Sequence, residues 1–177
     1  MRVLVGDRSV GLSIHRPYIG WPNFKPQITE LVSGLLETSL VGDVERFSLK
    51  YTNLVKGSNE FDLSPLTIGV RMGELKPNPQ GLAVKAEFSL NNCVTIVQIA
   101  TGVTIAIKAP SVDFESNGVL VDVDTICAGP FDNLSAQFPQ LLERTHDTEK
   151  EVFFSVLTPA YVDSLEPVWD AKNPKGN

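Results

Sequence analysis

The sequence predicts an α+β fold in which a mainly antiparallel sheet is packed by two long helices on one face. Short runs that alternate apolar and polar residues are typical of half-buried strands. Two longer segments carry apolar residues at spacings of three and four, which is the pattern of a helix face. Short connections between consecutive strands favour antiparallel pairing. The predicted order is therefore hairpin, helix, strand, variable linker, three-stranded meander and helix.

The N-terminal part predicts a hairpin and a first long helix. Residues 2–5 and 10–14 are β-type runs separated by the turn residues 6–9. From Trp21 onward the apolar residues recur at helical spacing as far as Leu36. Prolines at positions 22 and 26 fall within the opening turn, where missing N–H groups cost little, and Gly42 marks the exit.

The middle of the chain predicts four strands. Residues 44–55 alternate as one half-buried strand, and residues 82–90 and 94–107 form two more, with a turn at 91–92 and a bulge at Gly102. A further strand over 119–127 follows a turn at 117–118. Residues 56–80 leave two alternatives open, a short helix starting at Ser64 or a strand around residues 67–70.

The C-terminal part predicts a long helix over residues 133–157, with Leu142, Val152 and Val156 in its apolar stripe. Thr158 and Pro159 end it and begin a second short helix. We expect residues 1–167 to form a single α+β domain and residues 168–177 to form a flexible tail, because residues 170–177 contain no apolar residue other than Ala171.

Composition and charge exclude several classes of protein. The 177 residues include 15 Lys and Arg against 21 Asp and Glu, a net charge of −6, so binding to the phosphate backbone of a nucleic acid is disfavoured. Cys93 and Cys127 lie in strand-like runs, and we interpret them as reduced, half-buried side chains of a cytoplasmic protein. We find no apolar run of membrane-spanning length and no signal peptide.

Several segments together resemble one family. The segment RFSLKYTN at residues 46–53, a Leu-Leu-Glu-Arg-Thr-His-Asp run at 141–147, the aromatic pair at 153–154 and Leu-Thr at 157–158 are similar to the sporadically distributed, uncharacterised prokaryotic protein family. Trp21 and Phe24 at the start of the first helix agree with that pattern. The resemblance covers most of residues 1–167.

The resemblance implies the fold and a cytoplasmic prokaryotic origin more than an activity. It implies that this chain is an N-terminally short member or a fragment, because family members have further strand and helix upstream. A basic residue usually follows the strand asparagine in the family, where Leu54 stands here. The scattered distribution of the family hints at mobile or defence-linked loci, an association that does not establish function.

Three residues are candidates for a ligand-binding site. Tyr51 and Asn53 have polar tips on the apolar face of a strand, so they either line a pocket or clamp a backbone segment in the core. His146 precedes Asp147 on the long helix, but adjacent helical residues do not face one another. We therefore favour a helix-surface histidine bonded to a loop or strand, and we expect His15 to be solvent-exposed.

No catalytic, metal or cofactor site is predicted. Asp122 and Asp124 project from one strand face, an arrangement that suits oxygen ligands of a divalent cation, but a solvated outer face is the interpretation we favour. Zinc-ligand spacing, phosphate-binding glycine loops and nucleophile signatures do not occur in the sequence.

The leading functional hypothesis is a non-enzymatic cytoplasmic binding or regulatory protein. Its partner is a protein, or a second copy that pairs through the N-terminal hairpin, where an uncovered strand edge is expected. One alternative is a small-ligand-binding protein with an apolar cavity between the sheet and the C-terminal helix. A second alternative is an enzyme that uses His146 with a distant carboxylate.

Overall fold

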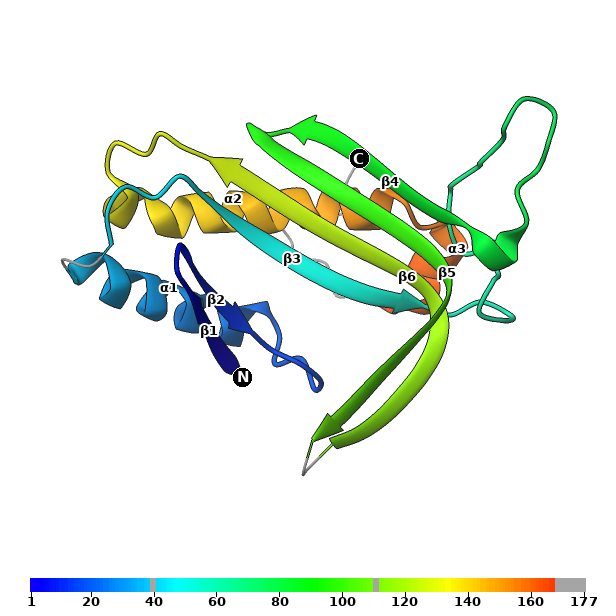
Figure 1. Ribbon diagram of the computed structural model, residues 1–177, viewed down its shortest axis with the longest axis horizontal. Helices are drawn as coiled ribbons and strands as arrows, with labels where there is room; N and C mark the ends of the chain where they lie inside the picture. The colour runs from blue at the N-terminus through cyan, green and yellow to red at the C-terminus, as the bar shows by residue number, and fades with distance from the viewer. Residues whose placement is uncertain (39–40, 110–111, 168–177) are drawn as a thin grey trace. The chain divides into compact units, whose positions relative to one another are not determined.

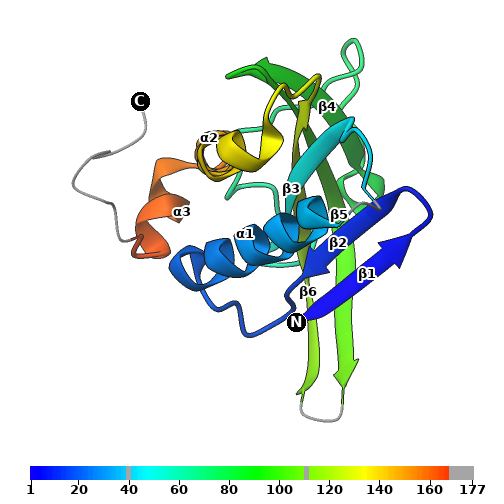
Figure 2. The ribbon, with the colours of Figure 1, turned by 90° about the vertical axis from the view of Figure 1, so that its left-hand side faces the viewer.

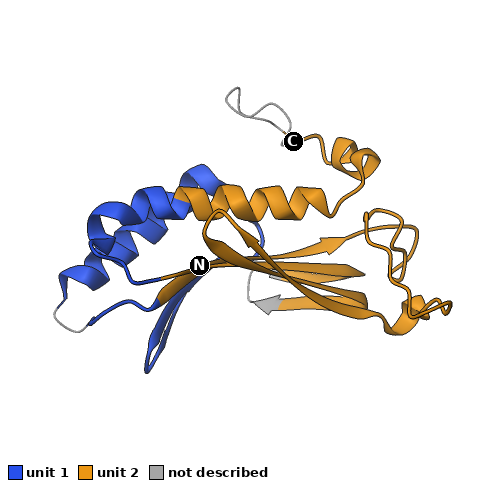
Figure 3. Cartoon of the chain, turned by 90° about the horizontal axis from the view of Figure 1, so that it is seen from above, with its two compact units in different colours: residues 1–45, 129–142 blue, residues 46–128, 143–177 orange. Residues whose placement is uncertain are grey.

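The computed structural model describes residues 1–38, 41–109 and 112–167. The tail predicted for residues 168–177 lies outside the described residues. The chain divides into two compact units, which Figure 3 colours separately: unit 1 comprises residues 1–45 and 129–142, and unit 2 comprises residues 46–128 and 143–177. Each unit is described below by itself.

Unit 1 contains a hairpin and helical segments. Strands β1 (Arg2–Gly6) and β2 (Ser9–Ser13) pair antiparallel around a two-residue turn and form a sheet of their own. Helix α1 (Trp21–Glu37) begins where the sequence predicts, with Pro22 in its first turn, but it ends five residues before Gly42. The first residues of helix α2 (Leu134–Ser155) also belong to this unit. The buried apolar side chains of unit 1 are Phe24, Leu134, Phe138 and Leu142.

Unit 2 is built on a four-stranded antiparallel sheet with the order β3-β6-β5-β4 (Figure 1). Its strands are β3 (Arg46–Val55), β4 (Ala83–Leu90), β5 (Cys93–Ala109) and β6 (Val112–Ala128). Strands β5 and β6 continue past the ends of β3 and β4 as a two-stranded arm, which Figure 2 shows from the side. Alternation therefore predicted which residues form this sheet, with one exception at its turns.

The turn predicted at residues 117–118 is wrong. Strand β6 runs through this position, with Asn117 opposite Thr104 and Gly118 opposite Val103, and its pairing with β5 continues as far as Ala109 opposite Val112. Glycine is needed at 118 for close packing, because a Cβ atom there would stand 2.6 Å from the carbonyl oxygen of Val55. An Asn-Gly pair in sequence cannot distinguish a turn from this close approach of two strands.

The other turn and bulge predictions in the meander are confirmed. Asn91 and Asn92 both have positive φ angles and connect β4 to β5. The β5–β6 register shifts between Ala100 and Val103, where Gly102 has a φ of 66°. A side chain at 102 would collide with the ring of Phe61, so the bulge also lets a loop pack against the strand.

Residues 56–82 form neither the helix nor the strand that the sequence left open. They make a long loop with an antiparallel bridge between Leu66 and Leu157, a second bridge between Met72 and Leu75, and a 3₁₀ turn, η1 (Pro79–Gly81). Hydrogen bonds from the Thr67 amide to the Val156 carbonyl and from the Thr158 amide to the Pro65 carbonyl fix the loop to the end of α2. The loop is therefore attached to the body of unit 2 by backbone bonds.

The core of unit 2 lies on one face of the sheet, under the later turns of α2. Val152, which the sequence places in the helix stripe, is buried there, and Val156 packs against the cluster. Helix α3 (Pro159–Ser164) follows, capped by the Thr158 side chain as predicted. The buried residues of this core are Val55, Leu66, Val97, Ile99, Val119, Val121, Val123, Val152 and Leu157.

The α+β class and the mainly antiparallel sheet are confirmed by this arrangement. We expected the N-terminal hairpin to belong to the same sheet as the other strands. Instead, β1 and β2 pair only with each other. None of the described helices is long and apolar enough to cross a membrane.

Candidate functional site

Buried polar side chains lie between α2 and the sheet of unit 2, next to the apolar core. They come from the inward faces of β5 and β6 and from the sheet-facing side of α2, and each is at most 8% exposed. We call this group the polar layer. Its members are Thr95, Thr125, Thr145, His146, Thr148 and Glu149.

Hydrogen bonds connect several members of the polar layer to each other and to the sheet. Thr95 and Thr125 stand directly opposite each other, with 3.1 Å between their hydroxyl oxygens. The Thr145 hydroxyl lies 3.1 Å from the sulfur of Cys127. The Thr148 hydroxyl accepts from the Asn91 side chain at 3.0 Å and donates to the Arg144 carbonyl. These bonds satisfy groups that would otherwise be costly to bury, so they fix α2 in one register on the sheet.

The structure brings together two of the three predicted site residues. The rings of Tyr51, on β3, and His146, on α2, have centroids 6.3 Å apart. Asn53 is half-buried two residues further along the same face of β3, as the alternation predicts. The aromatic contact crosses from the edge strand to the helix and is part of the packing of α2 against the sheet.

The predicted surface position of His146 is wrong, because this residue is only 8% exposed, while His15 is exposed as predicted. The buried side of α2 is wider than its apolar stripe and includes the polar residues on either side of it. The Asp147 carboxylate lies 3.8 Å from Nδ1 of His146, beyond hydrogen-bonding distance. A general base needs an orienting partner within hydrogen-bonding distance, and Asp147 is too far from Nδ1 to be that partner.

Glu149 is the functional candidate that the sequence analysis missed. It is 4% exposed, and its burial raises the pKa of its carboxyl group to about 8, although the neighbouring Lys150 opposes that shift. The carboxyl group is therefore mostly protonated at neutral pH and able to donate a hydrogen bond. Helix spacing could have predicted this burial, because Glu149 stands four residues after Thr145 and three before Val152, on the same side of α2.

A group of side chains on α2 offers ligand atoms for a cation. Glu143, His146 and Asp147 each place one such atom within 4.8 Å of the others, and within the described ranges no other group of this kind is found. A nitrogen and two carboxylate oxygens suit a borderline divalent ion. Carboxylates beside a histidine are common on helices without an ion, so we assign no metal site to them.

On the opposite face of the sheet, Asp122 is not part of a solvated surface, contrary to the prediction. It is 5% exposed and its carboxylate contacts three side chains: Thr52 donates at 2.7 Å, Lys50 forms an ion pair at 2.8 Å, and Gln98 donates at 3.3 Å. The hydrogen bond with Asp122 raises the pKa of Lys50. Flanking strands supply all three partners, so Asp122 holds the sheet together.

Cys93 and Cys127 form a disulfide, contrary to the expectation of reduced thiols. The register that pairs Val94 with Ile126 puts the two cysteines directly opposite each other, with Cα atoms 4.7 Å apart. The prediction was wrong because it was based on the position of both cysteines within strand-like runs, whereas a cross-strand pair can form a disulfide inside a sheet. Both sulfurs lie within the buried end of the sheet, beside the polar layer.

The N-terminal hairpin of unit 1 is a second candidate, as an interaction surface. Every residue of β1 is exposed, including Val3, Leu4 and Val5 at 50%, 60% and 79%. Arg8 in the turn forms an ion pair with Glu45, and both side chains are exposed. Val3 and Val5 lie on one face of the strand and Leu4 on the other, so both faces of the hairpin present exposed apolar side chains to water.

Comparison with protein-family models, with curated proteins and with solved structures finds no match to the chain. The function is therefore argued from the surfaces and side chains described above.

Proposed function

We propose that this protein is a non-enzymatic binding protein whose β1 strand pairs edge to edge with β1 of a second copy. The observation that carries the proposal is that β1 and β2 form a separate two-stranded sheet with an exposed apolar strand. A lone two-stranded hairpin is at best marginally stable in water, and a third strand gives it the pairing it lacks.

The outer edge of β1 has backbone groups that can pair with another strand. Gly6 and Ser9 close the two-residue turn, so Gly6, Leu4 and Arg2 bond to β2 while the amides of Val3 and Val5 point away from it. Among the described residues no strand covers this outer edge. Unpaired donors and acceptors along an apolar edge are a template for another strand.

A second copy fits this edge because the strand sequence is self-complementary. In an antiparallel β1–β1 pair centred on Leu4, Val3 of one copy stands opposite Val5 of the other, and these residues carry the outward backbone groups. Arg2 then faces Gly6, so no two like charges meet across the twofold axis. The result is an isologous dimer in which the five residues of β1 pair with β1 of the other copy, without any change in the hairpin itself.

Sedimentation equilibrium on proline variants tests the pairing. Val5→Pro removes an outward donor and leaves the bonds between β1 and β2 intact, because proline is tolerated on a strand edge. Val10→Pro is the matched control, since its amide also points outward but from β2. We expect the unmodified chain and the Val10 variant to dimerise at micromolar concentrations and the Val5 variant to stay monomeric, with circular dichroism verifying unchanged folding.

Two results would refute the proposal. One is a monomeric mass for the unmodified chain throughout that concentration range. The other is equal dimerisation of the Val5 and Val10 variants, which would place the contact elsewhere.

The alternative functions and the cellular location stay predictions. The hollow described below is not lined by Tyr51, Asn53 or His146, so it is a different place from the cavity predicted between sheet and helix. A cytoplasmic location and membership of the sporadically distributed prokaryotic family belong to the proposal. The redox state of Cys93 and Cys127 in cells bears on the location, because disulfides are rare in cytoplasmic proteins.

A further inference from the structure

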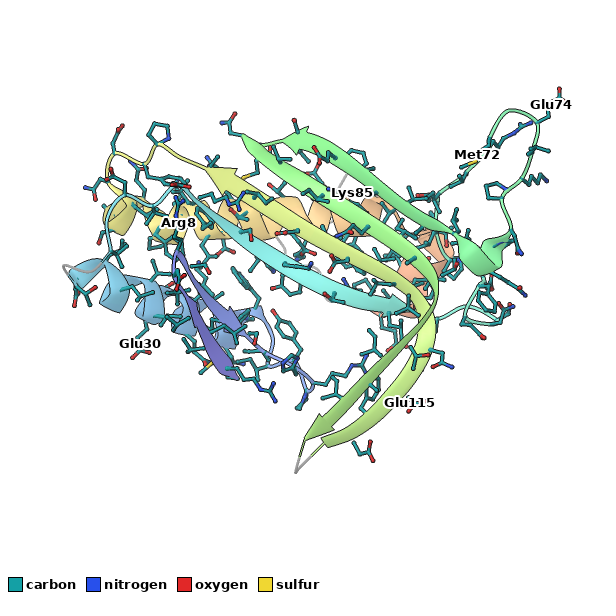
Figure 4. All side chains as sticks on the ribbon, in the orientation of Figure 1. Arg8, Glu30, Met72, Glu74, Lys85 and Glu115 are labelled. Carbon is teal, nitrogen blue, oxygen red and sulfur yellow. A yellow bond between two sulfur atoms is a disulfide. The ribbon has the colours of Figure 1, made fainter. Side chains whose placement is uncertain are left out.

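The loop of unit 2 between β3 and β4 carries two cationic residues, Arg71 and Lys76, that line the same hollow. The amide of each residue in the Met72–Leu75 bridge donates to the carbonyl of the other at 3.0 Å, and Gly73 makes the turn with a φ of 60°. Figure 4 labels Met72 and Glu74 at the tip of this loop. Arg71 and Lys76 are the next residues outward from this isolated bridge, one on each arm of the loop.

Arg71 and Lys76 carry like charges in an acidic protein. Both are exposed, and the described part of the chain supplies neither an ion pair nor a hydrogen bond to either side chain. Two cations that line one hollow repel each other. An anion placed between them would replace this repulsion with two attractions.

A hollow of about 290 Å³ lies beside these cations. Its walls are apolar apart from Arg71 and Lys76 and the backbone at Gly69, and the backbone around it is anchored. The Leu82 carbonyl accepts from the Thr101 amide at 3.1 Å, and the Pro79 carbonyl accepts from the Thr101 hydroxyl. The apolar lining residues are Leu63, Val70, Pro77, Pro79 and Leu82.

We propose that this hollow binds a small amphipathic anion, with its apolar body against Leu63 and Leu82 and its anionic head between Arg71 and Lys76. The volume is at the low end for ligand sites, which indicates a ligand smaller than a typical cofactor. The net charge of −6 does not attract anions at long range, so recognition must come from these two side chains at contact distance.

Titration with octanoate, followed by NMR, tests this site in the intact chain. 1-Octanol has the same apolar body without the charge, and acetate has the charge without the body. We expect octanoate to produce saturable shifts at residues 69–71, 76–77 and 82, and to bind at least about tenfold more tightly than either control compound. High salt should weaken octanoate binding, because exposed charges are screened.

Charge-removing variants identify the residues responsible. Arg71→Gln and Lys76→Gln together should weaken octanoate binding about tenfold or more, while leaving octanol binding unchanged. Lys85→Gln is the matched control, because Lys85 is an exposed lysine of β4 outside the hollow (Figure 4). Equal affinities for octanoate and octanol, equal weakening by the Lys85 variant, or shifts that do not saturate would each overturn the proposal. Dimerisation through β1 is measured separately, so the two proposals fail independently.

Discussion

Glu149 is buried although its residue type predicts a solvent-exposed position. Its position in the helix stripe, between Thr145 and Val152, is a core position by spacing, but a glutamate in a helix is normally solvent-exposed. The sequence analysis therefore counted only the apolar members of the stripe. The sheet beneath α2 carries polar as well as apolar inward side chains, among them Thr95 and Thr125. Which side chains lie under α2 depends on the register of the strands, and the spacing of residues along one helix does not determine that register.

We predict that Glu149→Gln removes a pH dependence of stability. The folded pKa of about 8 lies above the ordinary value of 4.5, so the folded state holds its proton through a range in which the unfolded state loses it. The stabilisation is complete below pH 4.5 and is lost as pH rises to about 8, at about 1.4 kcal/mol per pH unit. Urea unfolding should show that the free energy of unfolding of the unmodified chain falls steeply with pH across this window. The free energy of unfolding of the variant should change less with pH.

Glu151→Gln is the control for this measurement, because Glu151 is exposed on the same helix. Its pH profile should match that of the unmodified chain. If the Glu149 variant also follows that profile, then Glu149 is not the buried group that the structure places under α2.

The strands illustrate what an element-level pattern can and cannot determine. Alternation predicted β3 and β4 closely, and two asparagines with a glycine downstream predicted the turn and the bulge. The β5–β6 connection was misplaced because Asn117-Gly118 is a strong turn signal in sequence, whereas in the structure Gly118 accommodates the end of β3. Which residues of β5 and β6 face each other, Cys93 and Cys127 among them, depends on where that connection lies.

We predict that Cys93 and Cys127 are linked in the purified, unreduced protein. Iodoacetamide should add no mass to the chain in denaturant without reductant, and two alkyl groups after reduction. Because the bond spans 34 residues of sequence, reduction should lower the free energy of unfolding by about 2–4 kcal/mol. Two alkyl groups without reductant would show that the cysteines face each other as thiols.

At the scale of the whole molecule, the fold class followed from the order of elements, but the number of sheets did not. The strand and turn residues of segment 2–14 predict a hairpin. This local pattern does not determine which other strand, if any, pairs with the hairpin. The same limit applies to Tyr51 and His146, which the sequence singled out on separate elements and which meet only because α2 packs over β3. The single domain expected for residues 1–167 stays a prediction.

Amide hydrogen exchange at the N-terminal hairpin tests the central claim, pairing of β1 with a second copy, most directly. The amides of Val3 and Val5 point to the outer edge of β1, while those of Val10 and Leu12 point to the outer edge of β2 and serve as an internal control. We predict that exchange at Val3 and Val5 slows as protein concentration rises, while exchange at Val10 and Leu12 stays fast. Equally fast exchange at all four amides at every concentration would contradict the proposed dimer.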